Sequence, residues 1–319
     1  MEFISNCTAD AISNAAKALK DGHLVAFPTE TVYGLGADAT NEKAVSRIYS
    51  VKGRPSNHPL IVHISSINKL EKWATDIPDY AIKLAREFWP GPLTLILPRT
   101  NLAKDYITGG QNNVGLRVPD NPIALSLLRR YEEMGGLGVA APSANRFGAV
   151  SPTCAEAVQE ELGDYLGPTD LVLDGGRSLV GIESTIINCS NPTPQVLRPG
   201  VIFNQLLYNV TKIEFENPDI KTLKVSGNLN SHYRPKARVL INKIPKSGDG
   251  LIALDSIKTP NGVTRLSSPK NTQEMAREFY GAFRKADNLN INTIHIILPT
   301  GDGIELALYD RAFKASQSN

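Results

Sequence analysis

Short apolar runs alternate with amphipathic helical patterns through the first 200 residues, and this alternation constrains the fold more than any other feature. The runs are rich in Val, Ile and Leu and nearly continuous, which is typical of strands that a sheet buries on both faces. Strands separated by helices indicate an α/β fold whose sheet is covered on at least one face. The predicted strands occupy 23–29, 59–64, 93–98, 114–119, 137–142, 170–175 and 184–189.

Cap residues mark where the predicted helices begin. Thr8 and Asn41 have side chains that accept hydrogen bonds from the free N–H groups of a first helical turn. Apolar residues then recur with helical spacing as far as Leu19, and Gly22 supplies a stop. Further helices are predicted at 78–89, 122–131 and 153–162. In α/β sheets ligands gather on loops beyond the strand ends, so motifs at those junctions are the candidate site residues.

The alternation breaks between residues 208 and 236, where no period is sustained and no charge bias typical of disorder is present. We interpret this stretch as a linker that becomes ordered by contact. A second small α/β unit follows, with strands at 237–242, 251–255 and 293–299 and helices at 271–287 (capped by Asn271) and 303–315. The sequence therefore predicts a first domain over 1–207, a linker over 208–236 and a smaller domain over 237–319.

Composition narrows the class of protein. The length of 319 residues allows two domains that each have a core. A net charge of +2 gives no broad electrostatic footprint for nucleic acid. Cys7, Cys154 and Cys189 are widely spaced, which argues against a disulfide framework or a zinc site and fits a reducing cytosol. The sequence has no signal-peptide pattern and no apolar run of membrane-spanning length, so we expect a cytoplasmic protein without a membrane segment.

The stretch KGRPSNHPLIVH at 52–63 places two cations, Lys52 and Arg54, before a proline-stiffened turn and a buried strand. A point charge beside a planar guanidinium suits a polyphosphate, although two solvated cations in a loop are the alternative. The phosphate loop GxxxxGK[ST] is absent from the sequence. Residues 136–141 fit GxGxxA, but their glycines lead into a strand instead of opening a helix. We therefore expect any nucleotide to be bound by dispersed cations and hydroxyl groups.

Further segments accompany this stretch in a fixed order: PTETVYGLG (28–36), GLRVPDNP (115–122), APSANRFGAVSPT (141–153), GIESTIINC (181–189), LRPG (197–200) and SHYRPK (231–236). With KGRPSNHPL they resemble the motifs of the YrdC-like threonylcarbamoyl-AMP synthases, from about residue 10 to about residue 205. SHYRPK resembles the linker of the long, two-domain form. The resemblance implies a YrdC-like open twisted mixed sheet with helices, followed by a smaller Rossmann-like α/β domain.

The activity that the resemblance implies joins L-threonine, bicarbonate and ATP into threonylcarbamoyl-AMP and pyrophosphate. This product serves the N6-threonylcarbamoyladenosine modification of tRNA at position 37. The resemblance further implies that Mg²⁺ arrives with ATP, held mainly through the phosphates and not by a dedicated protein site. It also implies that the product passes to the tRNA threonylcarbamoyl-transferase machinery, and it leaves a weak direct contact with tRNA open.

Site residues follow from the same resemblance, position by position. The threonine-binding positions are Thr31, His63, Arg117, Ala141 and Ser184. The nucleotide-binding positions are Lys52, Arg54, His58, Asn113, Ser143, Ser151, Arg198 and Tyr233, of which Lys52 and Arg54 are also the candidate catalytic residues. Arg117 suits a carboxylate because its guanidinium offers two parallel donors; without the resemblance, an ion pair with Asp120 is favoured. Glu30 and Glu183 are interpreted as supporting carboxylates or as members of structural salt bridges.

His232 and Tyr233 belong to the segment that, by the same resemblance, folds across the active site, with Tyr233 reaching the nucleotide. Two other functions compete with the synthase. A non-catalytic RNA-binding module is disfavoured by the low net charge and by the lack of aromatic stacking motifs beside the cations. A carbamoyl-transfer maturation factor of similar domain type would add CxxC zinc segments, which this sequence lacks.

Overall fold

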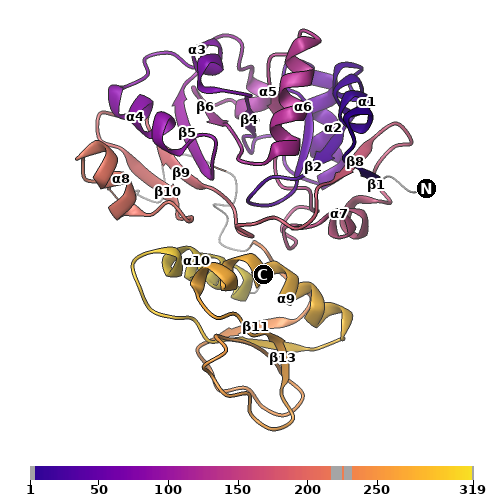
Figure 1. Cartoon of the computed structure of the whole chain (residues 1–319), viewed down its shortest axis with the longest axis vertical. Helices are drawn as coiled ribbons and strands as arrows, with labels where there is room; N and C mark the ends of the chain where they lie inside the picture. The colour runs from indigo at the N-terminus through magenta and orange to yellow at the C-terminus, as the bar shows by residue number, and fades with distance from the viewer. Residues whose placement is uncertain (1–3, 217–224, 226–231, 318–319) are drawn as a thin grey trace.

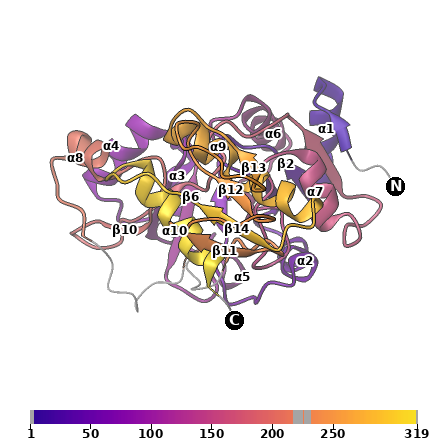
Figure 2. The ribbon, with the colours of Figure 1, turned by 90° about the horizontal axis from the view of Figure 1, so that it is seen from below.

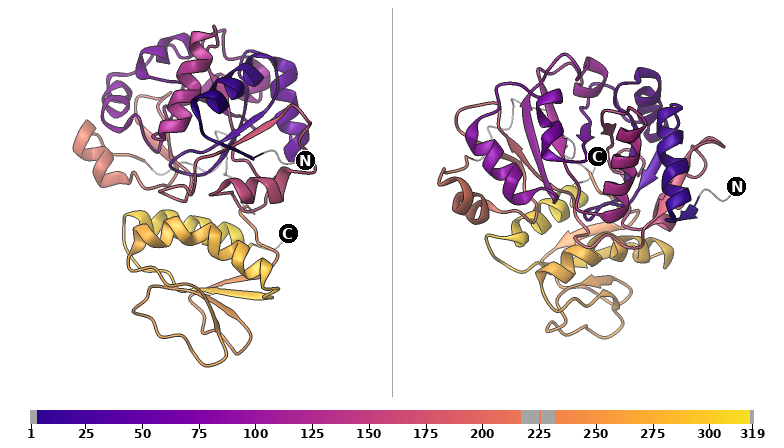
Figure 3. Two further views of the ribbon diagram at one scale, coloured as in Figure 1. Left: turned by 45° about the vertical axis from the view of Figure 1, so that its right-hand side comes forward. Right: turned by 45° about the horizontal axis from the view of Figure 1, so that its top comes forward.

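The computed structural model describes residues 4–216, 225 and 232–317, which form two α/β bodies (Figure 1). The first body contains the elements from β1 to α8, and the second those from β11 to α10. Two helices of the second body, α9 (Thr272–Asn288) and α10 (Ile304–Ser316), lie between its sheet and the first body (Figures 1 and 3). The helical layer of the smaller domain therefore faces the larger domain.

Within the described residues, the first body is built on a ten-stranded mixed sheet in the order β1-β8-β2-β3-β7-β4-β6-β5-β9-β10. The pairs β1/β8, β2/β8, β4/β6 and β5/β9 are parallel, and the remaining pairs are antiparallel. The mixed sheet that the resemblance implies is thus confirmed. Its strands are β1 (Ile4–Asn6), β2 (Val25–Phe27), β3 (Gly34–Asp38), β4 (Ile61–His63), β5 (Leu93–Pro98), β6 (Asn113–Arg117), β7 (Val139–Ala140), β8 (Leu171–Asp174), β9 (Thr185–Asn188) and β10 (Gln195–Arg198).

The helices begin where the sequence predicts caps. The Thr8 side chain accepts from the N–H of Ala11 at 3.1 Å, and that of Asn41 accepts from the N–H of Ala44 at 3.2 Å. The helices of the first body are α1 (Ala9–Lys20), α2 (Glu42–Lys52), α3 (Leu70–Trp73), α4 (Asp79–Phe88), α5 (Asp105–Thr108), α6 (Pro122–Glu133), α7 (Ala155–Leu162) and α8 (Asn204–Thr211). They bury their apolar residues against the sheet, as an α/β fold requires.

The second body has four strands in the order β11-β14-β12-β13, and all its pairs are parallel. The strands are β11 (Arg238–Ile241), β12 (Gly250–Ile252), β13 (Thr264–Ser267) and β14 (Thr293–Ile296). Asn271 caps α9 by accepting from the N–H of Glu274 at 2.8 Å, as predicted. Seen from below, this sheet and its helices lie in front of the larger body (Figure 2). The predicted Rossmann-like α/β unit is confirmed.

One hydrophobic cluster joins the two bodies. Val32, Val150 and Ile182 of the first body pack in the same cluster as apolar residues of α9 and α10. Gly181 lies at this contact with φ +82°, and a Cβ there would come within 2.4 Å of the Cα of Arg277 on α9. A glycine is therefore required for the backbones to approach this closely.

All the predicted strands and helices are present, and the differences have physical reasons. The prediction missed β3 because its two glycines lower strand propensity; a Cβ at Gly36 would meet the side chains of Phe27 and Val139 at 2.8 Å. It also missed the short elements β1, β10, β13, α3, α5 and α8. The predicted domain boundary at 207 lies inside α8, so the last helix of the first body ends at Thr211.

Candidate active site

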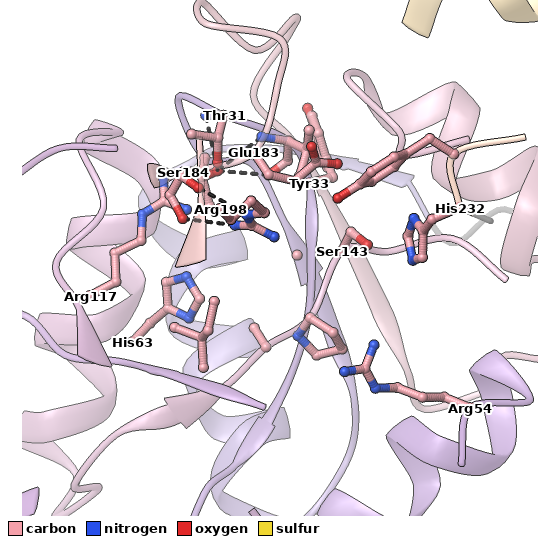
Figure 4. Close-up of a pocket in the computed structure, with 17 residues that line it drawn as sticks. Thr31, Tyr33, Arg54, His63, Arg117, Ser143, Glu183, Ser184, Arg198 and His232 are labelled. Atoms are coloured by element: carbon pink, nitrogen blue, oxygen red, sulfur yellow. Dashed lines mark hydrogen bonds between the residues drawn. The ribbon is translucent and has the colours of Figure 1, made fainter. Parts of the chain in front are cut away.

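One pocket of the first body gathers residues from the motif segments (Figure 4). They come from the ends of β4 and β6, from the loop before β3, from the turn at 141–143, from the loop before β9 and from the end of β10. The predicted residues in its wall are Thr31, Arg54, His63, Arg117, Ala141, Ser143, Ser184, Arg198 and Tyr233. All five positions predicted to bind threonine are therefore brought together, along with four of the eight predicted for the nucleotide.

Strand register places His63 beside Arg117, because the two residues are partners in the parallel pair β4/β6. The Arg117 Nη2 atom lies 2.7 Å from Glu30 Oε1, and its Nε donates to the carbonyl of Gly91 at 3.3 Å. The ion-pair partner of Arg117 is therefore Glu30 and not Asp120. These contacts fix the plane of a buried guanidinium that faces the pocket (Figure 4).

His63 is buried with its ring edge-on to Phe27, at 5.9 Å between ring centroids. Burial and the neighbouring charge of Arg117 lower the pKa of His63 to about 3. The ring is therefore neutral at physiological pH. Its Nδ1 atom has no hydrogen-bond partner among the described residues, so a polar ligand in the pocket can supply one.

Ser184 and Arg198 form one hydrogen-bonded unit at the edge of the sheet. Arg198 donates from Nη2 to the Ser184 hydroxyl at 3.0 Å and from Nε to the Ser184 carbonyl at 3.0 Å. The Ser184 hydroxyl also lies 2.8 Å from that of Thr94. Arg198 ends β10 and is 4% exposed, so it is not the solvated turn residue that LRPG alone would allow.

The opposite side of the pocket carries Arg54, Ser143 and His232 (Figure 4). The Arg54 guanidinium carbon lies 5.8 Å from the centroid of the Phe147 ring, and Nη2 donates to the carbonyl of Pro59 at 3.0 Å. Burial lowers the pKa of Arg54 to about 10, so the side chain remains a cation at neutral pH. The pocket wall thus carries Arg54 on this side and Arg117 and Arg198 across from it, with the hydroxyl groups of Ser143 and Ser184 beside them.

Lys52 is not the solvated loop cation of the alternative interpretation. It is the last residue of α2, it is 2% exposed, and Gly53 follows in a left-handed conformation. Its ammonium group donates to the carbonyl of Ser143 at 2.6 Å and to that of Asn145. Burial, with the charge of Arg54 second, lowers the pKa of Lys52 well below its usual value. Lys52 therefore supports the turn that presents Ser143 to the pocket.

Three other predicted nucleotide positions lie outside the wall of the pocket. The Ser151 hydroxyl donates to Glu183 Oε1 at 2.6 Å. The His58 ring lies edge-on to that of Phe147, 5.4 Å between centroids, and Asn113 begins β6. Contact of these residues, and of Lys52, with a nucleotide stays a prediction.

Glu183 lines the pocket and is the centre of a buried polar cluster that sequence reasoning missed. Besides Ser151, it accepts from the hydroxyl of Tyr280 on α9 at 2.9 Å and from Nε of Arg311 on α10 at 2.8 Å. Burial alone would raise the pKa of Glu183, but Arg311 and Arg198 hold it at about 2. Tyr280 and Arg311 belong to no motif, and only the packing of the second body brings them here.

Tyr233 and His232 close the pocket from the side of the second body. Tyr233 is 1% exposed with φ +62°, and its ring centroid lies 4.1 Å from that of His232 and 5.7 Å from that of Tyr280. The N–H of His232 donates to the carbonyl of Lys314 on α10 at 3.3 Å. His232 and Tyr233 therefore lie between the two bodies and form part of the pocket wall.

Within residues 4–216, 225 and 232–317, no three His, Cys, Asp or Glu residues are grouped so that they could hold a metal ion. The three cysteines are free thiols. No helix in the described part of the chain is both long and apolar enough to span a lipid bilayer.

Comparison with known proteins identifies the family. The Sua5/YciO/YrdC family model, described as telomere recombination, matches residues 17–200, and the model described as threonylcarbamoyl-AMP synthase, C-terminal domain, matches 201–317. The threonylcarbamoyl-AMP synthase of Pyrococcus abyssi is 38% identical, covering 95% of this chain and 93% of that protein. The synthase of Bacillus subtilis is 35% identical, covering 96% and 92%.

A solved structure agrees with the sequence comparison over both bodies. P. abyssi Sua5 complexed with L-threonine matches with a TM-score of 0.89 and 35% identity, covering 99% of this chain and 98% of that one. Both domains, in the same order, are therefore shared along almost the whole chain. The chain belongs to the Sua5/YrdC family of threonylcarbamoyl-AMP synthases, in the two-domain form that carries the C-terminal domain.

Proposed function

We propose that this chain is an L-threonylcarbamoyladenylate synthase, a nucleotidyltransferase that makes threonylcarbamoyl-AMP and pyrophosphate from L-threonine, bicarbonate and ATP. The observation that carries the proposal is one pocket with Arg117 and neutral His63 on one side and Arg54 on the other. A guanidinium on each side suits two anionic substrates bound together, the carboxylate of an amino acid and the phosphates of a nucleotide. Family membership supplies the identity of those substrates.

The reaction needs no covalent bond to the protein. The threonine amine and bicarbonate form a carbamate, with loss of water. A carbamate oxygen then bonds to the α-phosphorus of ATP, and the bond from that phosphorus to the bridging oxygen breaks to release pyrophosphate. Catalysis of this kind depends on positioning and on stabilisation of negative charge. Buried cations held by carbonyl and serine groups, as Arg54 and Arg198 are, meet this requirement.

Each side of the pocket has a defined role in this proposal. Arg117, whose guanidinium is oriented by Glu30 and by the carbonyl of Gly91, binds the threonine carboxylate. His63 Nδ1 forms a hydrogen bond with the amino acid. Arg54 and Ser143 bind phosphate oxygens, and Lys52 holds the Ser143 turn in place. Mg²⁺ enters bound to the phosphates of ATP as part of the substrate.

We further propose that the product is consumed by the machinery that transfers the threonylcarbamoyl group to tRNA at position 37. A mixed anhydride hydrolyses readily in water, so the enzyme that uses it must act in the same compartment. A cytoplasmic location, supported by three unpaired and dispersed cysteines, belongs to this proposal.

Pyrophosphate release measured with each substrate omitted in turn tests the proposal. Release should require ATP, L-threonine and bicarbonate together, and equal release without threonine would contradict the chemistry. Serine lacks only the methyl group of threonine, so discrimination between the two should be about 10- to 200-fold. Arg117→Ala should chiefly raise the threonine concentration needed for half-maximal rate. Arg99→Ala, at a cation that binds Asp105 and the Ala103 carbonyl outside the pocket, is the matched control and should leave it unchanged.

A further inference from the structure

The carboxylate of Glu183 is a charged group in the pocket wall whose partners come largely from another domain. Its carboxylate oxygens accept hydrogen bonds from the hydroxyl groups of Ser151 and Tyr280 and from the guanidinium of Arg311. Arg311 has no exposed surface and Glu183 is 6% exposed. A buried carboxylate is retained in ionised form only when a cation and hydrogen bonds compensate its loss of water.

Arg311 lies where its charge and hydrogen bonds can compensate the buried carboxylate of Glu183. Its Nε donates to Glu183 Oε2 at 2.8 Å, and its Nη1 donates to Asp310 Oδ2 at 2.6 Å. Its guanidinium carbon also lies 5.4 Å from the centroid of the Tyr233 ring. The single side chain therefore contacts a carboxylate and an aromatic ring that both line the pocket.

Glu183 is connected through the backbone to other residues of the pocket wall. Ser184 is the next residue, and it is bonded through its hydroxyl and its carbonyl to Arg198. Displacement of the Glu183 backbone would therefore move Ser184 and Arg198 as well. Gly181 and Ile182, which precede Glu183, pack directly on the second body, so this short segment is held by that body at both its backbone and its carboxylate.

We propose that Arg311 is a positioning residue for the active site, which acts by holding the Glu183 carboxylate ionised and in place from the C-terminal domain. Tyr280 assists it by donating to the same carboxylate. The proposal rests on the proposed function and assigns the C-terminal domain a direct part in it. The charged and titratable groups that face Glu183 or flank its partners are Arg198, His232, Tyr233, Tyr280, Asp310, Arg311 and Lys314.

The test compares Arg311→Met, Arg311→Lys and Tyr280→Phe with Arg238→Met. Arg238 is an exposed arginine of the same domain and serves as the matched control. Initial rates of pyrophosphate release are measured against threonine concentration between pH 6 and pH 8. Without Arg311, burial is no longer balanced, so the pKa of Glu183 should rise and the carboxylate should take up a proton as the pH falls.

We expect Arg311→Met to lower kcat at least tenfold relative to wild type at pH 8. The ratio of variant to wild-type kcat should fall by a further factor of at least five between pH 8 and pH 6, and this further fall is the acid limb of the variant. Arg311→Lys, which keeps the charge, should restore part of the rate and should bring the pH dependence most of the way back to that of the wild type. Tyr280→Phe should lower the rate a few-fold without an acid limb. Wild-type kinetics for Arg311→Met, or a loss that is equal at every pH, would overturn the proposal.

A second readout needs no activity. The free energy of unfolding of Arg311→Met relative to wild type is measured in urea at pH 7 and pH 5. If the folded variant binds a proton at Glu183, the difference in unfolding free energy between wild type and variant should shrink as the pH falls. The reason is that a carboxyl group whose pKa is higher in the folded than in the unfolded chain stabilises the folded state at low pH. An equal difference in unfolding free energy at both pH values would contradict the proposal, whether or not the wild-type chain makes threonylcarbamoyl-AMP. Inactive wild-type enzyme with a shrinking difference would refute only the proposed function.

Discussion

Replacement of Lys52 should destabilise the fold as well as the site, because the structure buries this side chain. Lys52→Ala removes three methylene groups from a side chain that is 2% exposed, at about 0.8 kcal/mol each. It also leaves the carbonyls of Ser143 and Asn145 without their donor, which costs about 1–3 kcal/mol when the groups are buried. The burial of an ammonium group is relieved at the same time. We expect a net loss of about 3 kcal/mol of unfolding free energy.

Urea denaturation followed by far-ultraviolet circular dichroism measures this loss. Lys52→Met keeps an apolar stem of similar length, so it should lose only the carbonyl contacts, about 1–2 kcal/mol. Lys43→Ala, at an exposed position of the same helix, should change stability by less than about 0.5 kcal/mol. Lys52→Met should remain folded and still lose most turnover, because the Ser143 turn is no longer held. Coincident urea midpoints for Lys52→Ala and Lys43→Ala would refute the reasoning.

The remaining predictions concern the domain contact, the buried histidine and the role of the linker. Gly181→Ala should lower both the melting temperature and the rate, because its Cβ would meet Arg277 Cα at 2.4 Å; Gly148→Ala, also at positive φ but with open space, is the control, and equal effects would contradict the close approach. His63, with a pKa of about 3 in the folded chain against about 6.5 when unfolded, makes wild-type stability fall as the pH drops from 7 to 5. His63→Gln should reduce that fall in urea titrations without abolishing it, because burial also lowers the pKa of His232 to about 3; an unchanged slope would show that His63 protonates in the folded state. A chain that ends at Glu216 should bind ATP more weakly and lose product synthesis, since it lacks Tyr233 and Arg311; undiminished synthesis at matched concentration would make the linker a passive tether.

Sequence reasoning located the pocket because its residues come from contiguous motifs at strand ends. His63 and Arg117 are neighbours only through the β4/β6 register, yet each lies at the end of a recognisable apolar strand, so both could be named in advance. Arg198 was also named, although LRPG in isolation allows a solvated turn. What the motifs could not give was the partner of each charge, which depends on three-dimensional packing. Glu30 therefore replaces Asp120 as the partner of Arg117.

The residues that sequence reasoning missed share one property. Arg311 and Tyr280 lie on amphipathic helices whose apolar pattern predicts only that one face is buried. The way the two domains pack decides which polar side chains of that buried face reach the site of the other domain. Residue spacing within one helix does not predict this packing. The burial of Lys52 could not be predicted for a related reason. A lysine at the end of a helix is usually solvated, and only the turn at 143–145 gives its ammonium group buried acceptors.

The hydrophobic cluster that Val32, Val150 and Ile182 share with α9 and α10 has a consequence for how the chain melts. Two domains without a shared apolar contact would unfold in two steps, each with its own enthalpy. Here the loss of the second domain would expose apolar side chains of the first and leave a carboxylate without its cation, so neither can unfold at its intrinsic temperature. Calorimetry should show a single transition whose enthalpy belongs to the whole chain. A C-terminal domain exchanged from a relative would then have to match this contact, residue by residue, for the two halves to unfold together.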